Sequence, residues 1–466
     1  MRFDMGTDVR TATTARASAP ALIAALALSV ALALTLPLGC EAAAAAAAPA
    51  AKVVAYRGAI LIDGTGAPPR SERVIVTAGE RITAVVPAAG FSAPAGTEVV
   101  DLSGRFVVPG FVNSHVHLAT LADPAHARAY LRRELYSGVT AVRDMAGDVR
   151  LLAELKREAE FNEIPSPDIY YVALMAGPEF FTDPRTHDAA RGRIAGEVPW
   201  MQALTPQTDL PLAVAAARGT GATALKLYAD LPAPLVRAVT AEAHRQHLLV
   251  WAHATIFPAG PLEEVDAGVD VLSHAALLGY ALESTIPPRY RHGALPLEVL
   301  PLLERPSARL DALFADMRRH GTILDATLYP YDTGPAALRS QGIADRLAAL
   351  AYRAGVAVST GTDDDGDLAR PSSPLLEEFT LLVRRAGMRL PDLLASATRI
   401  GAHAAGQQRD LGTIEPGKLA DFVVLEKDPL ADVANLGSIA LTVKRGIRYP
   451  QRDYRPVTEA EAHGAP

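Results

Sequence analysis

Two histidines separated by one residue, His115 and His117, follow an apolar run and could bind a single metal ion. Side chains at positions i and i+2 of a β-strand point to the same face, so both imidazoles would face that ion. His-x-His alone is a weak indication, because the pattern also occurs in proteins without a metal. Four further residues strengthen it, each near the carboxyl end of its own apolar run: Lys226, His253, His274 and Asp363.

These residue types fit one kind of chemistry. Imidazole nitrogens and carboxylate oxygens are the ligands that zinc takes in proteins, and manganese, cobalt and iron accept the same set. The carboxylate of Asp363 can also exchange a proton with a reacting group. We therefore predict that the six residues form one active site, with Asp363 as its catalytic residue.

The chain between residues 110 and 407 must position these side chains, and it alternates strand-like runs with helical stretches. The strand-like runs are FVNSHVH, GVTAVRD, DIYYVALM, TALKLY, LLVWAHA, VDVLSHA, GTILDATL and GVAVSTGTD. Eight β–α units fit an α/β protein with a (β/α)₈ TIM barrel, which usually takes ~250 residues plus insertions. Active sites of such barrels lie at the carboxyl ends of the strands, where the six residues stand.

Both ends of the remaining chain, residues 52–109 and 408–452, consist of short apolar runs broken by Gly, Pro and Asp. This pattern is typical of β-strands joined by tight turns. Because the termini of a domain usually lie close together, we predict one small β-sandwich built from both segments. Residues 453–466 are predicted to form a carboxyl-terminal tail.

Residues 1–40 are typical of a secretory signal peptide, because Arg2, Arg10 and Arg16 precede an uncharged apolar run over residues 19–39. Two ways of processing this segment are compatible with the sequence. One is cleavage within the alanine tract, and the other is lipidation of Cys40, which follows Leu-Gly as in a bacterial lipobox. Residues 41–51 then form an Ala-rich linker. We expect an exported protein, either periplasmic or anchored as a lipoprotein at Cys40, with membrane contact only through this segment.

Composition excludes several other classes of protein. With 49% hydrophobic and 21% charged residues, the 466-residue chain is neither disordered nor fibrous. A net charge of −7 without a long basic stretch argues against nucleic acid as a partner. One cysteine excludes a disulfide framework and a multi-cysteine zinc site. We expect a small-molecule substrate. Composition is compatible with either a monomer or a homo-oligomer.

Six motifs carry a resemblance to a known family. They are, in order, VVPGFVNSHVHL, GVTAVRDMAG, ALKLYADLP, DVLSHA, STGTD and LGTIEPGKLADFVVL. Together they resemble the metal-dependent amidohydrolase superfamily over about residues 55–449. The similarity is to the imidazolonepropionase-like branch, which also holds Xaa-Pro dipeptidases. The resemblance implies a metal-bearing (β/α)₈ barrel and a small β-sandwich made from both ends of the chain.

The resemblance also implies two divalent metal ions, most often zinc. It assigns His115, His117 and Asp363 to the more buried ion, and His253 and His274 to the second ion. The remaining member of the set, Lys226, would bridge both ions as a carbamate formed with carbon dioxide, beside a bridging hydroxide.

The carbamate has a chemical reason. A Lys226 ammonium has no lone pair for a metal ion and repels it, whereas a carbamate offers two oxygens and a negative charge. In the implied reaction the bridging hydroxide attacks the scissile carbonyl, and Asp363 carries its proton to the leaving nitrogen.

The expected function is hydrolysis of an amide- or peptide-type C–N bond in a dipeptide or an N-acyl amino acid. Ring opening of a cyclic amide, lactone or imidazolone is one alternative, and a non-catalytic, metal-binding surface lipoprotein is another. Tyr228 shares the inward face of Lys226, and in related dipeptidases a Tyr at this site contacts the substrate carboxylate. Thr327 and Tyr329, after the seventh strand, are further candidates for substrate binding.

The insertions after the third and sixth strand-like runs are expected to select the substrate. They carry side chains that could receive an aromatic or acidic group: Phe180, Phe181, Arg185, Trp200 and Arg291.

Overall fold

The computed structural model describes residues 52–121, 123–333, 342–364, 366 and 368–463. The predicted signal peptide, its Cys40 and the Ala-rich linker at 41–51 lie outside the described residues, as do residues 464–466. Within the described part of the chain, no helix combines the length and the apolar character needed to cross a membrane.

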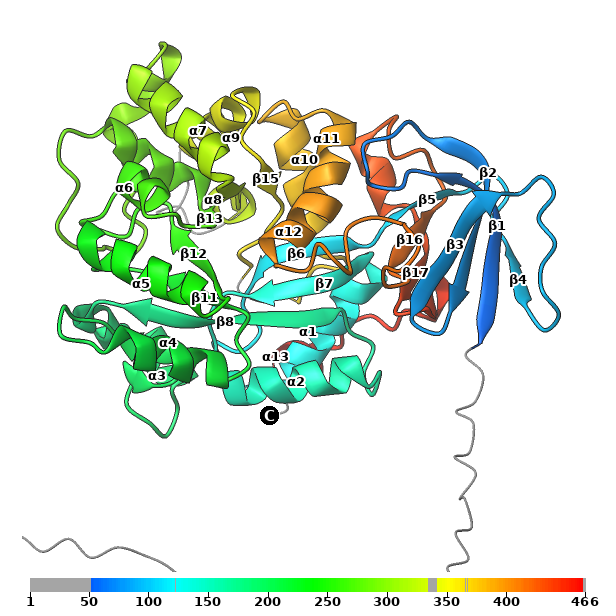
Figure 1. Ribbon diagram of the computed structural model, residues 1–466, viewed down its shortest axis with the longest axis horizontal. Coiled ribbons are helices and arrows are strands. Elements are labelled where there is room, and N and C mark those ends of the chain that lie inside the picture. Colours follow the sequence, from blue (N-terminus) through cyan, green and yellow to red (C-terminus); the bar gives the residue numbers. More distant parts are fainter. Residues whose placement is uncertain (1–51, 122, 334–341, 365, 367, 464–466) are drawn as a thin grey trace, which may run out of the picture. The chain divides into compact units, whose positions relative to one another are not determined.

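Eight parallel strands form the barrel that the sequence predicts (Figure 1). They are β6 (Phe111–Val116), β7 (Val139–Asp144), β8 (Asp168–Ala176), β11 (Ala224–Leu227), β12 (Leu249–His253), β13 (Val271–Ser273), β14 (Ile323–Asp325) and β15 (Val358–Ser359). Each strand pairs with the next in this order. A parallel bridge between Val116 and Asp364, and a 2.8 Å bond from Ser114 N to Thr360 O, join β15 to β6. The last strand therefore lies beside the first.

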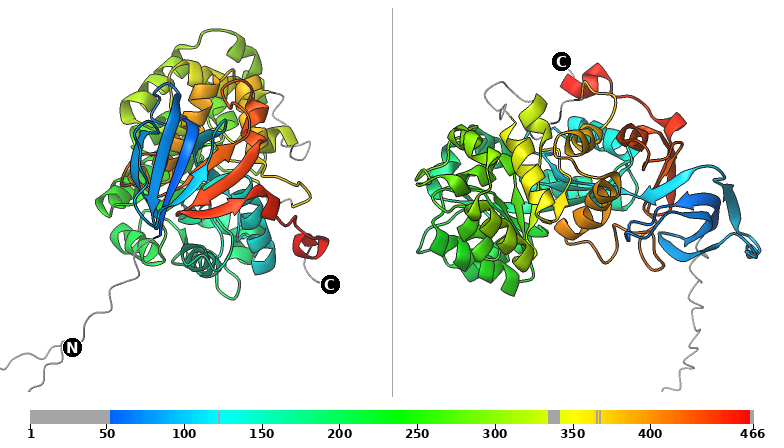
Figure 2. Two further views of the ribbon diagram at one scale, coloured as in Figure 1. Left: turned by 90° about the vertical axis from the view of Figure 1, so that its right-hand side faces the viewer. Right: turned by 90° about the horizontal axis from the view of Figure 1, so that it is seen from above.

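Helices follow the strands and cover the barrel on its outside (Figures 1 and 2). The longer ones are α1 (Pro124–Tyr136), α2 (Val149–Glu160), α4 (Leu210–Gly219), α5 (Ala233–Arg245), α7 (Ala308–His320), α9 (Ile343–Arg353) and α10 (Leu375–Arg384). Their ends follow from local sequence. The Asp123 side chain accepts from the first backbone N–H groups of α1, and α7 ends at Gly321, whose φ of 74° suits glycine.

Shorter elements extend the barrel at the carboxyl ends of its strands. The insertion after β8 contains η1 (Pro178–Thr182), α3 (Pro184–Ala189), β9 (Glu197–Val198) and β10 (Met201–Ala203). Strand β10 pairs with the last residues of β8, which holds this insertion against the barrel. The segments after β13 and β14 contain η2 (Ala275–Leu282), η3 (Leu297–Glu304) and α8 (Tyr329–Thr333).

The two terminal segments fold together apart from the barrel, as predicted, and their strands form one sheet of eight strands. Its members are β1 (Val53–Leu61), β2 (Arg70–Ala78), β3 (Arg81–Pro87), β4 (Glu98–Asp101), β5 (Phe106–Pro109), β16 (Phe422–Leu425), β17 (Ile439–Lys444) and β18 (Ile447–Pro450). Antiparallel pairing of β5 with β16 joins the two ends, seen as blue and red strands in the left view of Figure 2. The rings of Tyr56 and Phe422 pack edge to face, 4.9 Å apart, in a core of its own.

A buried ion pair connects this sheet to the barrel. Lys444 Nζ on β17 is 2.8 Å from Asp168 Oδ1 at the start of β8 and donates to the carbonyl oxygen of Ala159. The side chains of Lys444 and Asp168 are at most 3% exposed. After β18 the chain forms the short helix α13 (Glu459–His463), which Glu461 attaches to Arg132 of α1 through two 2.9 Å bonds.

Candidate active site

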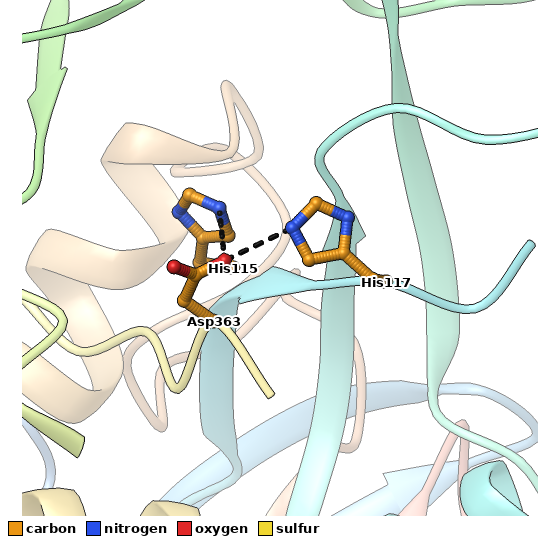
Figure 3. Close-up of side chains that lie close together, drawn as sticks. All are labelled: His115, His117 and Asp363. Atoms are coloured by element: carbon orange, nitrogen blue, oxygen red, sulfur yellow. Dashed lines mark hydrogen bonds and ion pairs between the residues drawn. The ribbon is translucent and has the colours of Figure 1, made fainter. Parts of the chain in front are cut away.

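Three of the predicted metal ligands converge on one point (Figure 3). His115 lies on β6, His117 directly follows that strand, and Asp363 follows β15. Asp363 Oδ1 is 3.1 Å from His115 Nε2 and 2.9 Å from His117 Nε2. The barrel brings them together, because Asp363 N donates to the carbonyl oxygen of His115 where β15 lies beside β6.

Asp325 is a fourth residue of this cluster and was not predicted from the sequence. It ends β14, is fully buried, and its Oδ2 lies 2.7 Å from His115 Nδ1. Such a contact holds a proton on Nδ1, so Nε2 is the nitrogen that faces Asp363 and is placed to bind a metal ion. Burial would lower the pKa of His115, but the carboxylates of Asp363 and Asp325 outweigh burial and raise it, so a metal ion would displace a proton from Nε2. The available signal was a carboxylate at the carboxyl end of an apolar strand, the same signal that identified Asp363.

The other three predicted ligands lie beside this cluster. The ring centroids of His253 and His274 are 4.7 Å apart, and the His274 ring is 5.1 Å from that of His115. Lys226 is buried, and its Nζ donates to the hydroxyl of Ser273 at 3.2 Å. All six predicted residues border one cavity of about 210 Å³.

Burial sets the protonation of these groups. It lowers the pKa of His253 well below its ordinary value and that of His274 to about 3, so both imidazoles are neutral at pH 7. Burial also lowers the pKa of Lys226 to about 8, against the opposing effect of Asp325 and Asp363. Burial would raise the pKa of Asp363, but the imidazoles of His115 and His117, which contact its carboxylate, outweigh burial and hold the pKa well below its ordinary value, so the carboxylate stays ionised.

These residues fit a metal-binding site. His253 Nδ1 is buried and has no hydrogen-bond partner among the described residues, although buried polar atoms are nearly always paired. Neutral imidazoles and an ionised carboxylate are the forms that bind zinc-like ions. The neutral amine that a lowered pKa makes accessible at Lys226 is the form that can react with carbon dioxide.

The three predicted substrate-binding residues occupy different places. Tyr228 borders the cavity, and its ring lies 3.9 Å from that of His253. Thr327 is buried behind His274, at 2.9 Å between Oγ1 and Nδ1. Tyr329 lies on α8 and is not among the residues that border the cavity, whereas Tyr331 of the same helix is.

Residues of the two insertions complete the cavity wall. Arg185 of α3 and Tyr290, which follows η2, border it together with Tyr228. The Tyr228 and Tyr290 rings meet edge to face at 5.5 Å, and the Arg185 guanidinium lies 6.0 Å from the Tyr228 ring centroid. Arg185 and Tyr290 thus face the predicted metal ligands, whereas Phe180, Phe181, Trp200 and Arg291 are not among the residues that border this cavity.

Comparison with known proteins agrees with this arrangement. The model of the amidohydrolase family matches residues 106–448. An imidazolonepropionase of Streptomyces griseus is 29% identical over 383 residues, which cover 76% of this chain and 86% of that protein. One from Cutibacterium acnes is 30% identical over 369 residues, covering 75% and 83%. The crystal structure of a candidate prolidase from Bifidobacterium longum superimposes with a TM-score of 0.66 at 26% identity, covering 88% of this chain and 97% of that one. The chain therefore belongs to the amidohydrolase family and is a hydrolase that acts on carbon–nitrogen bonds.

Proposed function

We propose that the protein hydrolyses the C–N bond between an acyl or aminoacyl group and an amino acid, in a dipeptide or an N-acyl amino acid. The observation that carries this proposal is the position of Tyr228, which packs 3.9 Å from the ring of His253 and borders the site cavity. Burial raises the pKa of Tyr228, so its hydroxyl stays protonated and can donate to a carboxylate. A carboxylate held there places the neighbouring C–N bond over the histidines and Asp363.

The residues that would hold metal are those that the resemblance assigns. His115, His117 and Asp363 would bind one divalent ion, and His253 and His274 a second. The remaining residue, Lys226, would lie between the two ions as a carbamate. Zinc suits this donor set. Bound ions would supply a water molecule that is deprotonated near pH 7 and would polarise the scissile carbonyl.

The protein's own side chains have separate tasks in this proposal. Asp363 accepts the proton of the attacking water and passes it to the leaving nitrogen, because its ionised carboxylate lies among the imidazoles. Asp325 orients His115, and Thr327 contacts His274 at Nδ1. Tyr228 positions the substrate through its carboxylate.

Ring opening of a cyclic amide or imidazolone is the second candidate function. The similarity to proteins named imidazolonepropionase favours it, at 29–30% identity over most of both chains. It would use the same residues and differ only in how the insertions hold the substrate.

We also propose that the protein acts outside the cytoplasm. The support is the basic start and the apolar run over residues 19–39. Fractionation of cells that produce the full chain tests this. If Cys40 is lipidated, Cys40→Ser moves the protein from the membrane to the soluble fraction, and a cytoplasmic wild type contradicts export.

The activity is tested on the full chain supplied with zinc and bicarbonate. N-acetyl amino acids, dipeptides, lactones and an imidazolone are offered, and Asp363→Asn serves as the inactive control. We expect hydrolysis of N-acetyl amino acids or dipeptides and close to two zinc ions per chain. Turnover of cyclic substrates alone would favour the second function, and one zinc ion with an unmodified Lys226 would refute the binuclear site.

A further inference from the structure

A second, smaller cavity of about 50 Å³ opens beside the site cavity. The two cavities share four residues: His117, Met145, Arg185 and Tyr228. The remaining wall of this side cavity is mainly apolar and includes Leu174, Phe180, Ala189 and Met201. Thr186 also borders this side cavity, but its hydroxyl donates to the carbonyl oxygen of Asp183 at 2.7 Å and adds no free polar group to the wall. The side cavity therefore suits an apolar group of a molecule bound at the site.

Arg185 is the one permanently charged residue among the four that border both cavities. Asp183, which caps α3, orients it through bonds from Nε at 3.1 Å and Nη2 at 2.7 Å. These bonds use two of the five guanidinium N–H donors, so donors remain for a ligand. The Arg185 side chain is 43% exposed and lies against the Tyr228 ring. Asp183 therefore fixes the orientation of the Arg185 guanidinium, and the side of the guanidinium that faces the cavity stays accessible to a ligand.

We propose that Arg185, beside Tyr228, binds the same α-carboxylate of the leaving amino acid and that the side cavity receives the side chain of that amino acid. This inference rests on the proposed function and adds its substrate class. The carboxylate and the side chain of an amino acid share one carbon atom. A residue that borders both cavities can therefore hold the carboxylate while the side chain enters the smaller cavity.

The size of the side cavity defines the class of amino acid. A water-sized position needs about 10–15 Å³, so the cavity takes roughly three to five non-hydrogen atoms. Valine, leucine, isoleucine and methionine side chains have three or four. Phenyl and indole groups exceed this space, and glycine leaves it unfilled. The preferred substrates are N-acyl or aminoacyl derivatives of medium-sized aliphatic amino acids.

The experiment compares kcat/KM of the zinc-loaded full chain for N-acetyl-L-leucine, N-acetylglycine, N-acetyl-L-tryptophan and N-acetyl-L-leucinamide. We expect leucine to exceed glycine by at least roughly 10–200-fold, because that is the contribution of a single methylene group in a fitted pocket and the leucine side chain has more than one carbon. The tryptophan derivative is expected to be poor. N-acetyl-L-leucinamide tests the contribution of the negative charge of the carboxylate, because this compound has the leucine side chain but no carboxylate.

Arg185→Met tests the guanidinium. A hydrogen bond to a charged group contributes ~1.5–3 kcal/mol, so the acid-to-amide ratio of kcat/KM is expected to fall roughly 10–100-fold, mainly through KM. Arg185→Lys should restore part of the ratio. Arg193→Met, an exposed arginine just beyond α3, is the matched control and should leave the ratio unchanged.

Two variants test the side cavity. Ala189→Leu fills it and should narrow the leucine-to-glycine ratio, whereas Met201→Ala enlarges it and should raise the rate with the tryptophan derivative. Thermal unfolding confirms that each variant is folded. An unchanged acid-to-amide ratio in Arg185→Met, or an unchanged ranking of side chains in both cavity variants, overturns this inference alone. No hydrolysis of any N-acyl amino acid or dipeptide by the wild type refutes the proposed function, and this inference with it.

Discussion

Replacing Asp325 should weaken metal binding although it is none of the six predicted ligands. Asp325 Oδ2 lies 2.7 Å from His115 Nδ1, and the two side chains are 0% and 2% exposed. The carboxylate keeps a proton on Nδ1, so Nε2 is the nitrogen that faces Asp363 and is placed to bind a metal ion. Loss of such a partner typically costs about 10–100-fold in metal affinity, or ~1.4–2.8 kcal/mol.

Two variants separate charge from hydrogen bonding. Asp325→Asn keeps the shape and an amide oxygen that can accept from His115, so we expect the lower end of that range. Asp325→Ala removes the acceptor and should reach the upper end. Ser114 retains the carbonyl oxygen of Thr360 as an acceptor at 2.7 Å, and Ser359 loses only a long 3.5 Å bond to Asp325, so the main loss is the buried His115 donor. The metal-free protein should lose about 1–3 kcal/mol of unfolding free energy from this change.

Zinc affinity is measured by competition with a chromophoric chelator, and stability by urea unfolding of metal-free protein. Asp311→Asn, an exposed carboxylate of α7, is the control and should match the wild type in both. Zinc affinity within twofold of the wild type for both Asp325 variants would refute the orienting role of this carboxylate.

Three other changes test separate parts of the structure. Asp363→Asn should lower kcat by roughly 10²–10⁴-fold while the fold is kept, as measured by kinetics and circular dichroism, and a near-normal kcat would remove Asp363 from proton transfer. Lys444→Met removes one of the two cations paired with Asp168, because Arg445 Nε stays 2.9 Å from both carboxylate oxygens, and should cost about 1–3 kcal/mol in urea unfolding through the lost buried bonds to Asp168 and Ala159, whereas a loss below about 0.5 kcal/mol would contradict this. His244 bonds to Asp270 at 2.8 Å, which raises its pKa, so its contribution is complete below the unfolded-state pKa and is lost as the pH rises through the folded-state pKa. His244→Gln should therefore destabilise the protein more at pH 5.5 than at pH 8.5, by no more than ~1 kcal/mol for this partly exposed pair, and equal losses at both would contradict the assignment.

Much of the fold could be predicted because it depends on local sequence patterns. Seven of the eight barrel strands lie within the predicted apolar runs and β8 extends one residue beyond its run, since strands of a parallel barrel are buried on both faces and are mostly apolar. The assembly of both ends into one β-structure was expected from their similar patterns, and the pairing of β5 with β16 joins them. The His-x-His spacing likewise placed His115 and His117 on one face of a single strand.

The orientation of individual side chains could not be predicted, because it depends on contacts between distant segments. Asp325 and Thr327 follow each other closely in the sequence, yet one contacts His115 and the other His274. Tyr331, and not Tyr329, borders the cavity because helix α8 turns one of them inward.

The sequence by itself determined which residues stand at the carboxyl ends of the barrel strands, and hence the six candidate ligands and the family chemistry. Only the tertiary structure decided what lies around them. The insertion after β8 packs against the barrel through β10 and brings Arg185 beside Tyr228, and the same packing forms the apolar side cavity. Strand periodicity is a property of neighbouring residues, whereas a cavity is bounded by side chains far apart in the chain, and their packing exists only in the folded protein.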